Sequence, residues 1–513
     1  MSPSVTNTAR MRCARRSRVR DKRVGRIHFA RKRAVPMGCG AAPHVINLSE
    51  VWPMGMKESL LRQIPNIERL LSNPSITDSE LYRHEIADAV RDVVTQLRQG
   101  VLADDVDRIP EDEEILRDAL ELAGRRADQQ GIRRVVNGTG VILHSNFGRA
   151  CLSRAAAQAA SAAAVGYCSL EYDLEKGARG SRTGCIEEWL RKLTGCESSL
   201  IVNNNAAAML LFLSTFASGG NVIVSRGQLV EIGGAFRLPN IIKQCGCELR
   251  EVGTTNKTRI SDYADAIDGN TRALLKVKSS NYKIIGFTQS VEIKDIAELG
   301  AKHNIPVIDN IGSSALVDVR RYGIYDEPFA PQSLKDGADV VSFSGDKLLG
   351  GPQCGIVLGR KKHISMMKTH ALYRAFRADK MTIAALEATL RVHADLPAAE
   401  RDIPVLAMLA LSVDDLRIRA EKLLEKIKEL GGSAEIIPSK STTGGGTLPG
   451  TELDSFAIMP TGKLGADKTE EKLRLLSVPI IGHITEDRLQ LDVRTMFEED
   501  FDYIANSVAD ATK

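Results

Sequence analysis

A glycine-rich turn that follows an apolar run carries the residues with the clearest chemical potential. Segment 342–352 reads Ser-Phe-Ser-Gly-Asp-Lys-Leu-Leu-Gly-Gly-Pro, so Lys347 stands just beyond the end of a predicted buried strand. A buried lysine with cations nearby loses its proton readily, and the neutral amine can attack an aldehyde cofactor such as pyridoxal phosphate. We therefore predict that Lys347 forms a Schiff base with this cofactor and that Ser344 contacts the cofactor phosphate.

Two other interpretations of this turn stay open at the level of the motif. Ser344 and Lys347 also have the spacing of the nucleophile pair in penicillin-binding enzymes, but the S-D-N and K-T-G motifs expected beside it do not occur in the sequence. The second alternative is a surface lysine on a glycine turn, because an isolated S-x-x-K match is common by chance.

A phosphate-bearing cofactor also needs an anion site and a polar partner for its ring. Segment 202–208, Val-Asn-Asn-Asn-Ala-Ala-Ala, is where a predicted strand turns into a helix. The free N–H groups of such a turn bind phosphate, which nominates Asn204 and Asn205; the alternative is a plain asparagine helix cap. Asp309 ends another predicted strand and is the candidate partner of the pyridine nitrogen, the alternative being an ordinary turn residue.

Three arginines are candidates for holding a substrate anion. Arg374 and Arg377 are three residues apart and would share one face of a helix. Paired guanidinium groups suit a phosphate-bearing substrate, although a solvated charged face would have the same pattern. Arg149 offers a third cation on a loop, and His144 on the same loop is a candidate lining residue of the site.

Alternation of strands and helices predicts the architecture that positions these residues. Between 131 and 394, short apolar runs at 222–224, 274–277, 306–308 and 340–343 alternate with helical stretches at 206–216, 232–244, 263–267 and 293–303. This pattern predicts an α/β domain with a mainly parallel sheet covered by helices on both faces.

Two further regions flank this predicted catalytic domain. Residues 57–130 have helical periodicity, with a first helix over 60–71 that ends at Asn73-Pro74 and others starting near 77 and 110. Residues 395–513 predict a smaller α+β domain, with helices over 413–430 and 498–508 and strands over 478–482 and 489–493.

The net charge of +4 combines two opposite contributions in the 513-residue chain. Residues 1–45 contain 12 basic residues and one acidic residue, a net charge of +11, so the remainder carries −7. We expect 1–45 to be a disordered extension. It has the composition of a transit peptide, a nucleic-acid-binding arm or sequence upstream of the true start codon, and we favour the last.

Other composition features exclude several classes of protein. No apolar run approaches the ~20 residues that a membrane-spanning helix needs. Nine cysteines are scattered without the spacing of a zinc site, which indicates reduced thiols in a cytoplasmic protein.

The sequence resembles the bacterial selenocysteine synthases, or L-seryl-tRNA(Sec) selenium transferases. The resemblance covers about residues 57–513 and is carried by seven stretches, at 137–149, 170–174, 201–208, 224–237, 251–256, 342–351 and 373–382. It implies fold type I of the pyridoxal phosphate enzymes and conversion of L-seryl-tRNA(Sec) to L-selenocysteyl-tRNA(Sec) with selenophosphate, through a cofactor-bound aminoacrylyl intermediate.

The resemblance also implies roles for parts of this chain. Lys347 would be the Schiff-base lysine, and Arg149, Arg374 and Arg377 the anion-binding arginines. The helical domain 57–130 would grip the tRNA, and the enzyme would assemble in the cytoplasm as a homo-oligomeric ring of dimers. The main alternative is another fold type I lyase or aminotransferase that acts on a small phosphorylated amino acid or amino sugar acid.

One departure from the family pattern concerns the ring partner. The family reads Asp-Leu-Gly-Ser-Gly after the strand, whereas this chain reads Asp309-Asn-Ile-Gly-Ser313. The aspartate is displaced by one residue, and one step along a strand turns a side chain to the opposite face. Either Asp309 or Asn310 would therefore face the ring.

Overall fold

The computed structural model describes residues 54–76, 79–129, 131–233, 236–444 and 446–513. The chain divides into two compact units, Met1–Arg134 and Val135–Lys513. The basic segment 1–45 lies outside the described residues. Among the helices of the described residues, none has both the length and the apolar character that crossing a bilayer requires.

The first unit is helical. It contains α1 (Met54–Gln63), α2 (Ile67–Leu71), a short 3₁₀ turn, α3 (Arg83–Leu102) and α4 (Asp112–Gln129). The single helix predicted over 60–71 is wrong: α1 ends at Gln63, because Pro65 disfavours helical backbone in Ile64 before it. Asn66 then starts α2 by accepting a hydrogen bond from the backbone N–H of Glu68. Buried apolar residues of α3 and α4 form a core of their own.

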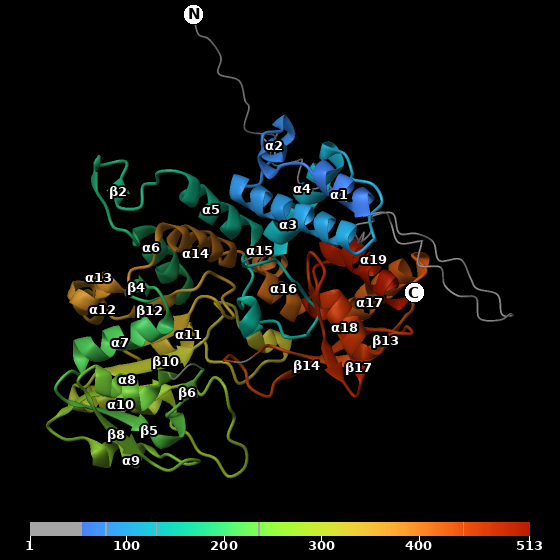
Figure 1. Cartoon of the computed structure of the whole chain (residues 1–513). Helices are drawn as coiled ribbons and strands as arrows, with labels where there is room; N and C mark the ends of the chain where they lie inside the picture. Colours follow the sequence, from blue (N-terminus) through green and yellow to red (C-terminus); the bar gives the residue numbers. More distant parts are fainter. Residues whose placement is uncertain (1–53, 77–78, 130, 234–235, 445) are drawn as a thin grey trace, which may run out of the picture. The chain divides into compact units, whose positions relative to one another are not determined.

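A seven-stranded sheet forms the centre of the second unit (Figure 1). Its order is β4-β12-β11-β10-β9-β5-β8, and every strand runs parallel to the others except β12, which is antiparallel to both neighbours. The predicted mainly parallel sheet is therefore confirmed. The strands are β4 (Ser198–Val202), β5 (Asn221–Ser225), β8 (Glu248–Val252), β9 (Thr271–Val277), β10 (Val307–Gly312), β11 (Val340–Ser344) and β12 (Gly355–Gly359).

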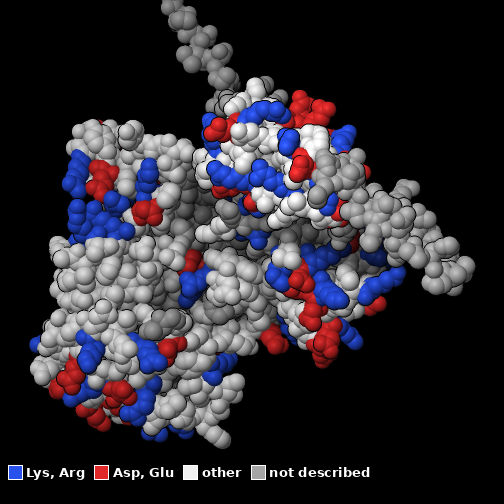
Figure 2. Space-filling model, in the orientation of Figure 1, with Lys and Arg blue, Asp and Glu red and all other residues white. Residues whose placement is uncertain are grey.

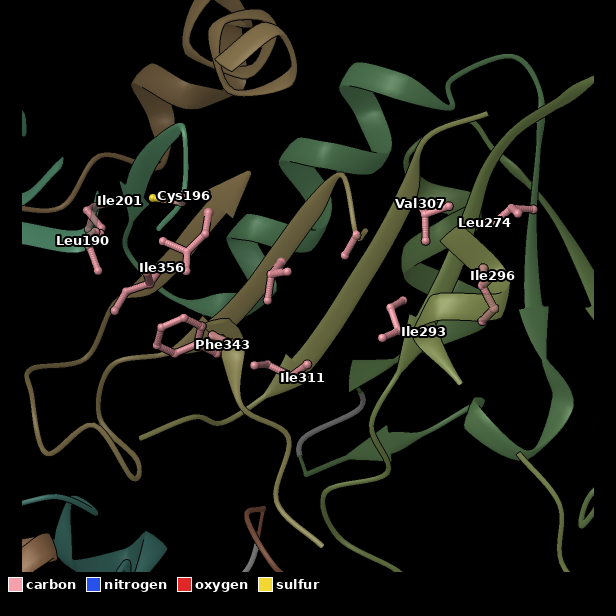
Figure 3. Packing of buried hydrophobic residues seen from close by; sticks show 14 of the residues in the cluster. Leu190, Cys196, Ile201, Leu274, Ile293, Ile296, Val307, Ile311, Phe343 and Ile356 are labelled. Carbon is pink, nitrogen blue, oxygen red and sulfur yellow. The ribbon is translucent and has the colours of Figure 1, made fainter. Parts of the chain in front are cut away.

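Helices cover both faces of this sheet, because alternate side chains of the strands point to opposite sides. One apolar cluster joins strand residues such as Ile311, Phe343 and Ile356 to helices on the first face (Figure 3). These helices are α6 (Gly184–Thr194), α9 (Ile260–Ala266), α10 (Ile293–His303), α11 (Ala330–Lys335) and α14 (Lys380–His393). A second cluster joins the other face to α7 (Asn205–Phe216), α8 (Leu238–Gln244) and α12 (Lys361–Thr369).

The helix predicted over 232–244 forms only in its second half. The chain first makes a short hairpin of β6 (Glu231–Ile232) and β7 (Phe236–Arg237). Pro239 then occupies the first turn of α8, where its fixed φ angle favours helix initiation and its missing N–H is not needed. The helix therefore begins beside the proline.

A four-stranded antiparallel sheet of order β13-β14-β17-β16 forms the C-terminal part. Its strands are β13 (Ala434–Thr442), β14 (Glu452–Pro460), β17 (Arg488–Asp492) and β16 (His483–Thr485), and α17 (Val413–Glu429), α18 (Ala466–Arg474) and α19 (Phe501–Thr512) pack on it. The predicted strand 478–482 is shorter, as β15 (Ile480–Ile481), and pairs with β1 (Val136–Asn137). This pairing fixes the start of the loop that carries Arg149.

Several shorter elements complete the second unit. They are α5 (Arg154–Val165), the hairpin of β2 (Tyr172–Asp173) and β3 (Ala178–Arg179), α13 (Ala371–Ala375), α15 (Leu396–Asp402) and α16 (Pro404–Ala410).

Candidate active site

Lys347 lies in a tight turn just beyond the C-terminal end of β11. The turn is closely packed: a Cβ added at Gly345 would lie 2.7 Å from the carbonyl oxygen of Pro352. The lysine is 8% exposed, and its Nζ donates a hydrogen bond of 2.6 Å to the carbonyl oxygen of Gly446. The amine is thus held between the central sheet and a segment that follows β13.

Charged neighbours surround this amine in two separate pairs. Arg149 contacts Asp346 at 2.6 Å, and Lys278 contacts Glu327. In the part of the chain that the structure describes, neither carboxylate forms an ion pair with Lys347. Burial, and next to it the Arg149 guanidinium, lowers the pKa of Lys347 to about 8. The arrangement therefore gives Lys347 a larger neutral fraction near physiological pH than an exposed lysine has.

The Lys278–Glu327 pair lies at the same edge of the sheet. Lys278 directly follows β9, and its backbone N–H donates to the carbonyl oxygen of Asn310 at 3.0 Å. Burial raises the pKa of Glu327 to about 7, and its Oε1 is buried with no hydrogen-bond partner among the described residues. Burial also lowers the pKa of Lys278. Burial therefore disfavours the charged form of both groups.

The N-terminus of α7 adjoins β12 and β10. Gly355 permits the close approach, because a Cβ there would lie 2.3 Å from the carbonyl oxygen of Asn204. The Asn204 side chain caps the helix by accepting from the backbone N–H of Ala207 at 2.8 Å. Asn205 donates to Oδ1 of Asn310 at 3.0 Å. The backbone N–H groups of the first turn, and not these two side chains, are thus the groups suited to a phosphate.

Asp309 and Asn310 lie on opposite faces of β10. Asn310 shares the α7 face with Asn205, whereas Asp309 is buried on the face covered by α11, close to Ser333. Burial raises the pKa of Asp309 to about 6. The structure does not bring the predicted ring partner Asp309 together with Asn204 and Asn205. Asn310 occupies that position, because strand alternation turns the two side chains apart.

The candidate arginines come from three different places. Arg149 adopts a left-handed conformation, with φ 64°, in the loop after β1. Arg374 is exposed on α13, but α13 ends at Ala375, so the prediction that Arg374 and Arg377 share a helix face is wrong. Arg377 instead bridges to Val202 in extended form, because Asp379 caps the next helix, α14.

Arg377 belongs to a positive cluster around one carboxylate. Glu171 contacts Arg182 at 2.8 Å, Arg179 at 3.0 Å and Arg377 at 3.5 Å. The hydrogen bond from Arg182 lowers the pKa of Glu171. Figure 2 shows positive side chains gathered over the segment that carries β2 and β3. Three guanidinium groups on one carboxylate leave positive charge available to an anion.

Unpaired buried oxygens mark the space beside Lys347 and α7. Ser342 lies on the α7 face of β11, as Ser344 does two residues later, and its Oγ is buried without a partner in the described residues. The same holds for further side-chain oxygens, namely Asn205 Oδ1, Thr443 Oγ1 and Thr447 Oγ1. Buried polar atoms are normally satisfied, so these oxygens favour a polar ligand. The described residues contain no cluster of metal-ligating side chains.

Several residues of this site were missed by the sequence analysis. Lys278 stands one residue after a predicted strand, and this position at the edge of the sheet was the available signal. Asp346 lies inside the predicted lysine turn. Glu327 and Thr443 come from loops without a recognisable pattern. Gly446 belongs to the glycine run 444–446, which predicts a turn but not its contact with the lysine.

Comparison with known proteins places this arrangement in a family. A family model described as L-seryl-tRNA selenium transferase matches residues 135–497. The L-seryl-tRNA(Sec) selenium transferase of Carboxydothermus hydrogenoformans is 47% identical over 458 residues, covering 87% of this chain and 96% of the relative. That of Moorella thermoacetica is 44% identical over 457 residues, covering 88% and 97%.

A solved structure supports the fold. D-Glucosaminate-6-phosphate ammonia-lyase superposes with a TM-score of 0.54 at 19% identity, covering 75% of this chain and 97% of the lyase. The expected α/β architecture of fold type I is thereby confirmed. Since the family model spans most of the second unit and the relatives match along nearly their whole length, this chain belongs to the L-seryl-tRNA(Sec) selenium transferase family.

Proposed function

We propose that this protein converts L-seryl-tRNA(Sec) to L-selenocysteyl-tRNA(Sec) with selenophosphate as selenium donor and pyridoxal phosphate as cofactor. The observation that carries the proposal is the buried Lys347 amine, which is held at 2.6 Å from the Gly446 carbonyl while the neighbouring carboxylates pair with other cations. A neutral amine is what a Schiff-base lysine needs.

The residues around Lys347 fit the cofactor. The first turn of α7 and Ser344 would hold its phosphate, Lys347 its aldehyde carbon, and Asn310 its ring nitrogen. When bound, pyridoxal phosphate supplies an electron-accepting ring that stabilises negative charge at the amino acid Cα. An amide is a weaker partner for that nitrogen than the aspartate predicted at Asp309, so more of the stabilisation would rest on the surrounding cations.

Side chains of this chain would carry out the remaining steps. The Lys347 Nζ takes the proton from the seryl Cα as general base. Arg149 is fixed by Asp346 at 2.6 Å and faces the same site, where it would hold the selenophosphate anion together with Arg374 and Arg377. Glu327, whose pKa is raised to about 7 by burial, is suited to give a proton to the departing hydroxyl.

The other regions have proposed roles in this function. Residues 57–130 would bind the tRNA, 131–394 the cofactor, and 395–513 would close the site through the segment with Gly446. Residues 57–131 carry 10 basic and 17 acidic residues, so individual arginines such as Arg62, Arg69 and Arg83 would meet the phosphates. We further propose a cytoplasmic homo-oligomer built as a ring of dimers, as in the resemblance described above.

The direct test is incubation of the cofactor-loaded protein with seryl-tRNA(Sec) and radiolabelled selenophosphate, followed by analysis of the aminoacyl group. We expect labelled selenocysteyl-tRNA from the wild-type chain and from the exposed-lysine control Lys361→Ala, and none from Lys347→Ala. Activity of Lys347→Ala equal to wild type would exclude the assigned lysine.

The alternative function is a lyase or aminotransferase reaction on a small phosphorylated amino acid or amino sugar acid. Its basis is the fold shared with D-glucosaminate-6-phosphate ammonia-lyase. The helical first unit, with its own apolar core, has no role in that reaction. Turnover of such a small substrate, with none of seryl-tRNA(Sec), would support the alternative.

A further inference from the structure

A cavity lies on the loop that carries Arg149. It is an open depression with a volume of about 540 Å³, lined by the 139–147 segment together with residues of β13 and of the β15–β16 region. Its lining includes His144, Phe147, Lys440 and His483. The residues proposed to hold the cofactor and the selenium donor do not line this cavity. The proposed reaction therefore leaves the cavity without an assigned ligand.

The wall of this cavity combines aromatic surface with unpaired polar atoms. The rings of His144 and Phe147 stack with their centroids 3.9 Å apart and their planes 14° from parallel. Nδ1 of His144 and Nδ1 of His483 are buried and have no hydrogen-bond partner among the described residues. Burial lowers the pKa of His144, so this ring stays neutral and offers one donor and one acceptor nitrogen.

Two short segments connect the cavity to Lys347. The backbone N–H groups of Ile142 and Leu143 donate to the carbonyl oxygens of Thr442 and Thr443 at 3.0 and 2.9 Å. Four residues beyond Thr442, the Gly446 carbonyl accepts from Lys347 at 2.6 Å. Four residues span at most about 14 Å when fully extended. The Gly446 carbonyl that holds the reactive amine therefore lies within about 14 Å of Thr442 at the cavity wall.

We propose that this cavity binds the adenine base of the terminal nucleoside of the aminoacyl-tRNA, whose ribose carries the seryl ester. The inference rests on the function proposed above and names a subsite for the same substrate. Proteins recognise single-stranded bases by stacking them on aromatic and histidine rings and by hydrogen bonds to the base edge. The His144–Phe147 stack would supply the surface, and the two histidine nitrogens the hydrogen bonds.

A phosphate is a poorer occupant for this cavity than a base. Lys440, the cation at its wall, already pairs with Asp454, and the neutral His144 adds no charge. A purine instead matches an aromatic wall and presents both a donor and an acceptor on its edge. Of these two ligands, only the base would both stack on the aromatic rings and form hydrogen bonds with the two unpaired nitrogens.

The test measures binding of a hydrolysis-resistant probe, adenosine carrying serine through a 3′-amide, to the cofactor-loaded enzyme. Its uridine counterpart is the matched ligand. We expect the adenosine probe to bind about tenfold more tightly than the uridine probe, and Phe147→Leu and His483→Ala each to lose about tenfold in affinity for it. Phe147→Tyr should restore binding, because it keeps the ring.

Kinetics with seryl-tRNA(Sec) separate this subsite from the chemistry. The two variants should raise KM about tenfold while kcat and borohydride trapping at Lys347 stay at wild-type values. The exposed controls Tyr167→Ala and His303→Ala should change neither probe affinity nor KM. Equal affinity of folded wild type and Phe147→Leu for the adenosine probe, or no binding by either, would overturn the subsite, whereas loss of the proposed function itself would appear as an inactive wild-type enzyme.

Discussion

The side-chain amine of Lys347 donates a hydrogen bond of 2.6 Å to the main-chain carbonyl oxygen of Gly446, which is 99 residues further along the chain. A carbonyl oxygen accepts a hydrogen bond from a neutral amine as well as from an ammonium group, so this contact positions Nζ without requiring a charge. Arg149 and Lys278 meanwhile engage the nearby carboxylates. The contact with Gly446 therefore orients the Lys347 side chain whether or not its amine is protonated.

The first prediction concerns how the protonation of the Lys347 amine, and with it the rate of cofactor capture, depends on pH. Its pKa is lowered to about 8, chiefly by burial, so the neutral fraction grows as the pH rises through that value. We expect the rate at which the cofactor-free protein captures pyridoxal phosphate, trapped with borohydride and located by mass spectrometry, to reach half its maximum near pH 8. A midpoint near pH 10, the ordinary pKa of an exposed lysine, would contradict the lowered pKa of Lys347.

Arg149→Met should move that midpoint upward. The substitution removes a cation that lowers the lysine pKa and frees the carboxylate of Asp346, which raises it. Both effects act in the same direction, and we expect about one pKa unit, or about tenfold less neutral amine at pH 7. Arg250→Met is the control, because Arg250 pairs with Asp268 at a half-exposed position away from the lysine.

The second prediction concerns the buried Lys278–Glu327 pair. Glu327→Gln leaves the Lys278 ammonium buried without its carboxylate, which should cost about 3 kcal/mol of unfolding free energy in urea denaturation. The double variant Lys278→Met/Glu327→Gln should recover most of this loss, because it removes both charges. Asp326→Asn breaks an exposed pair with Lys283 and should change stability by less than about 1 kcal/mol.

The same pair should shift the titration of Lys347 in opposite directions. The Glu327 carboxylate raises the pKa of Lys347 and the Lys278 ammonium lowers it. Glu327→Gln should therefore lower the midpoint of cofactor capture and Lys278→Met should raise it. Identical midpoints in both variants would show that the pair does not act on the lysine.

Local pattern was enough to predict the parts of the site that lie close together in sequence. An apolar strand followed by a glycine turn predicted the position of Lys347, and the asparagine run predicted the start of α7 within one residue. Lys278 and Glu327 are 49 residues apart, and a buried pair at that separation has no periodic trace in the sequence. Arg377 left the expected helix because Asp379 begins a new one.

The third prediction concerns the close approach of β12 to the N-terminus of α7. Gly355→Ala would put a Cβ 2.3 Å from the carbonyl oxygen of Asn204, and a backbone atom cannot rotate away. We expect the first turn of α7 to shift and cofactor affinity, measured by equilibrium dialysis, to fall about tenfold, equivalent to 1.4 kcal/mol. Gly269→Ala is the control, because a Cβ there meets nothing within 4 Å.

The last prediction is that the Asp309 carboxylate destabilises the folded chain and does not contact the cofactor. Its pKa is raised to about 6 by complete burial, above the ordinary value of 3.8. Between these values the folded chain binds more protons than the unfolded chain, so the unfolding free energy must fall as the pH rises from 4 to 6. Asp309→Asn removes the ionisation while keeping the shape, and it should raise the unfolding free energy by about 3 kcal/mol at pH 7. At pH 4 the difference should nearly vanish, because the aspartate is then protonated in the folded state.

Cofactor affinity should be unchanged in Asp309→Asn but weakened in Asn310→Ala, which loses the bond to Asn205. The reverse pattern of affinities would place Asp309 at the ring.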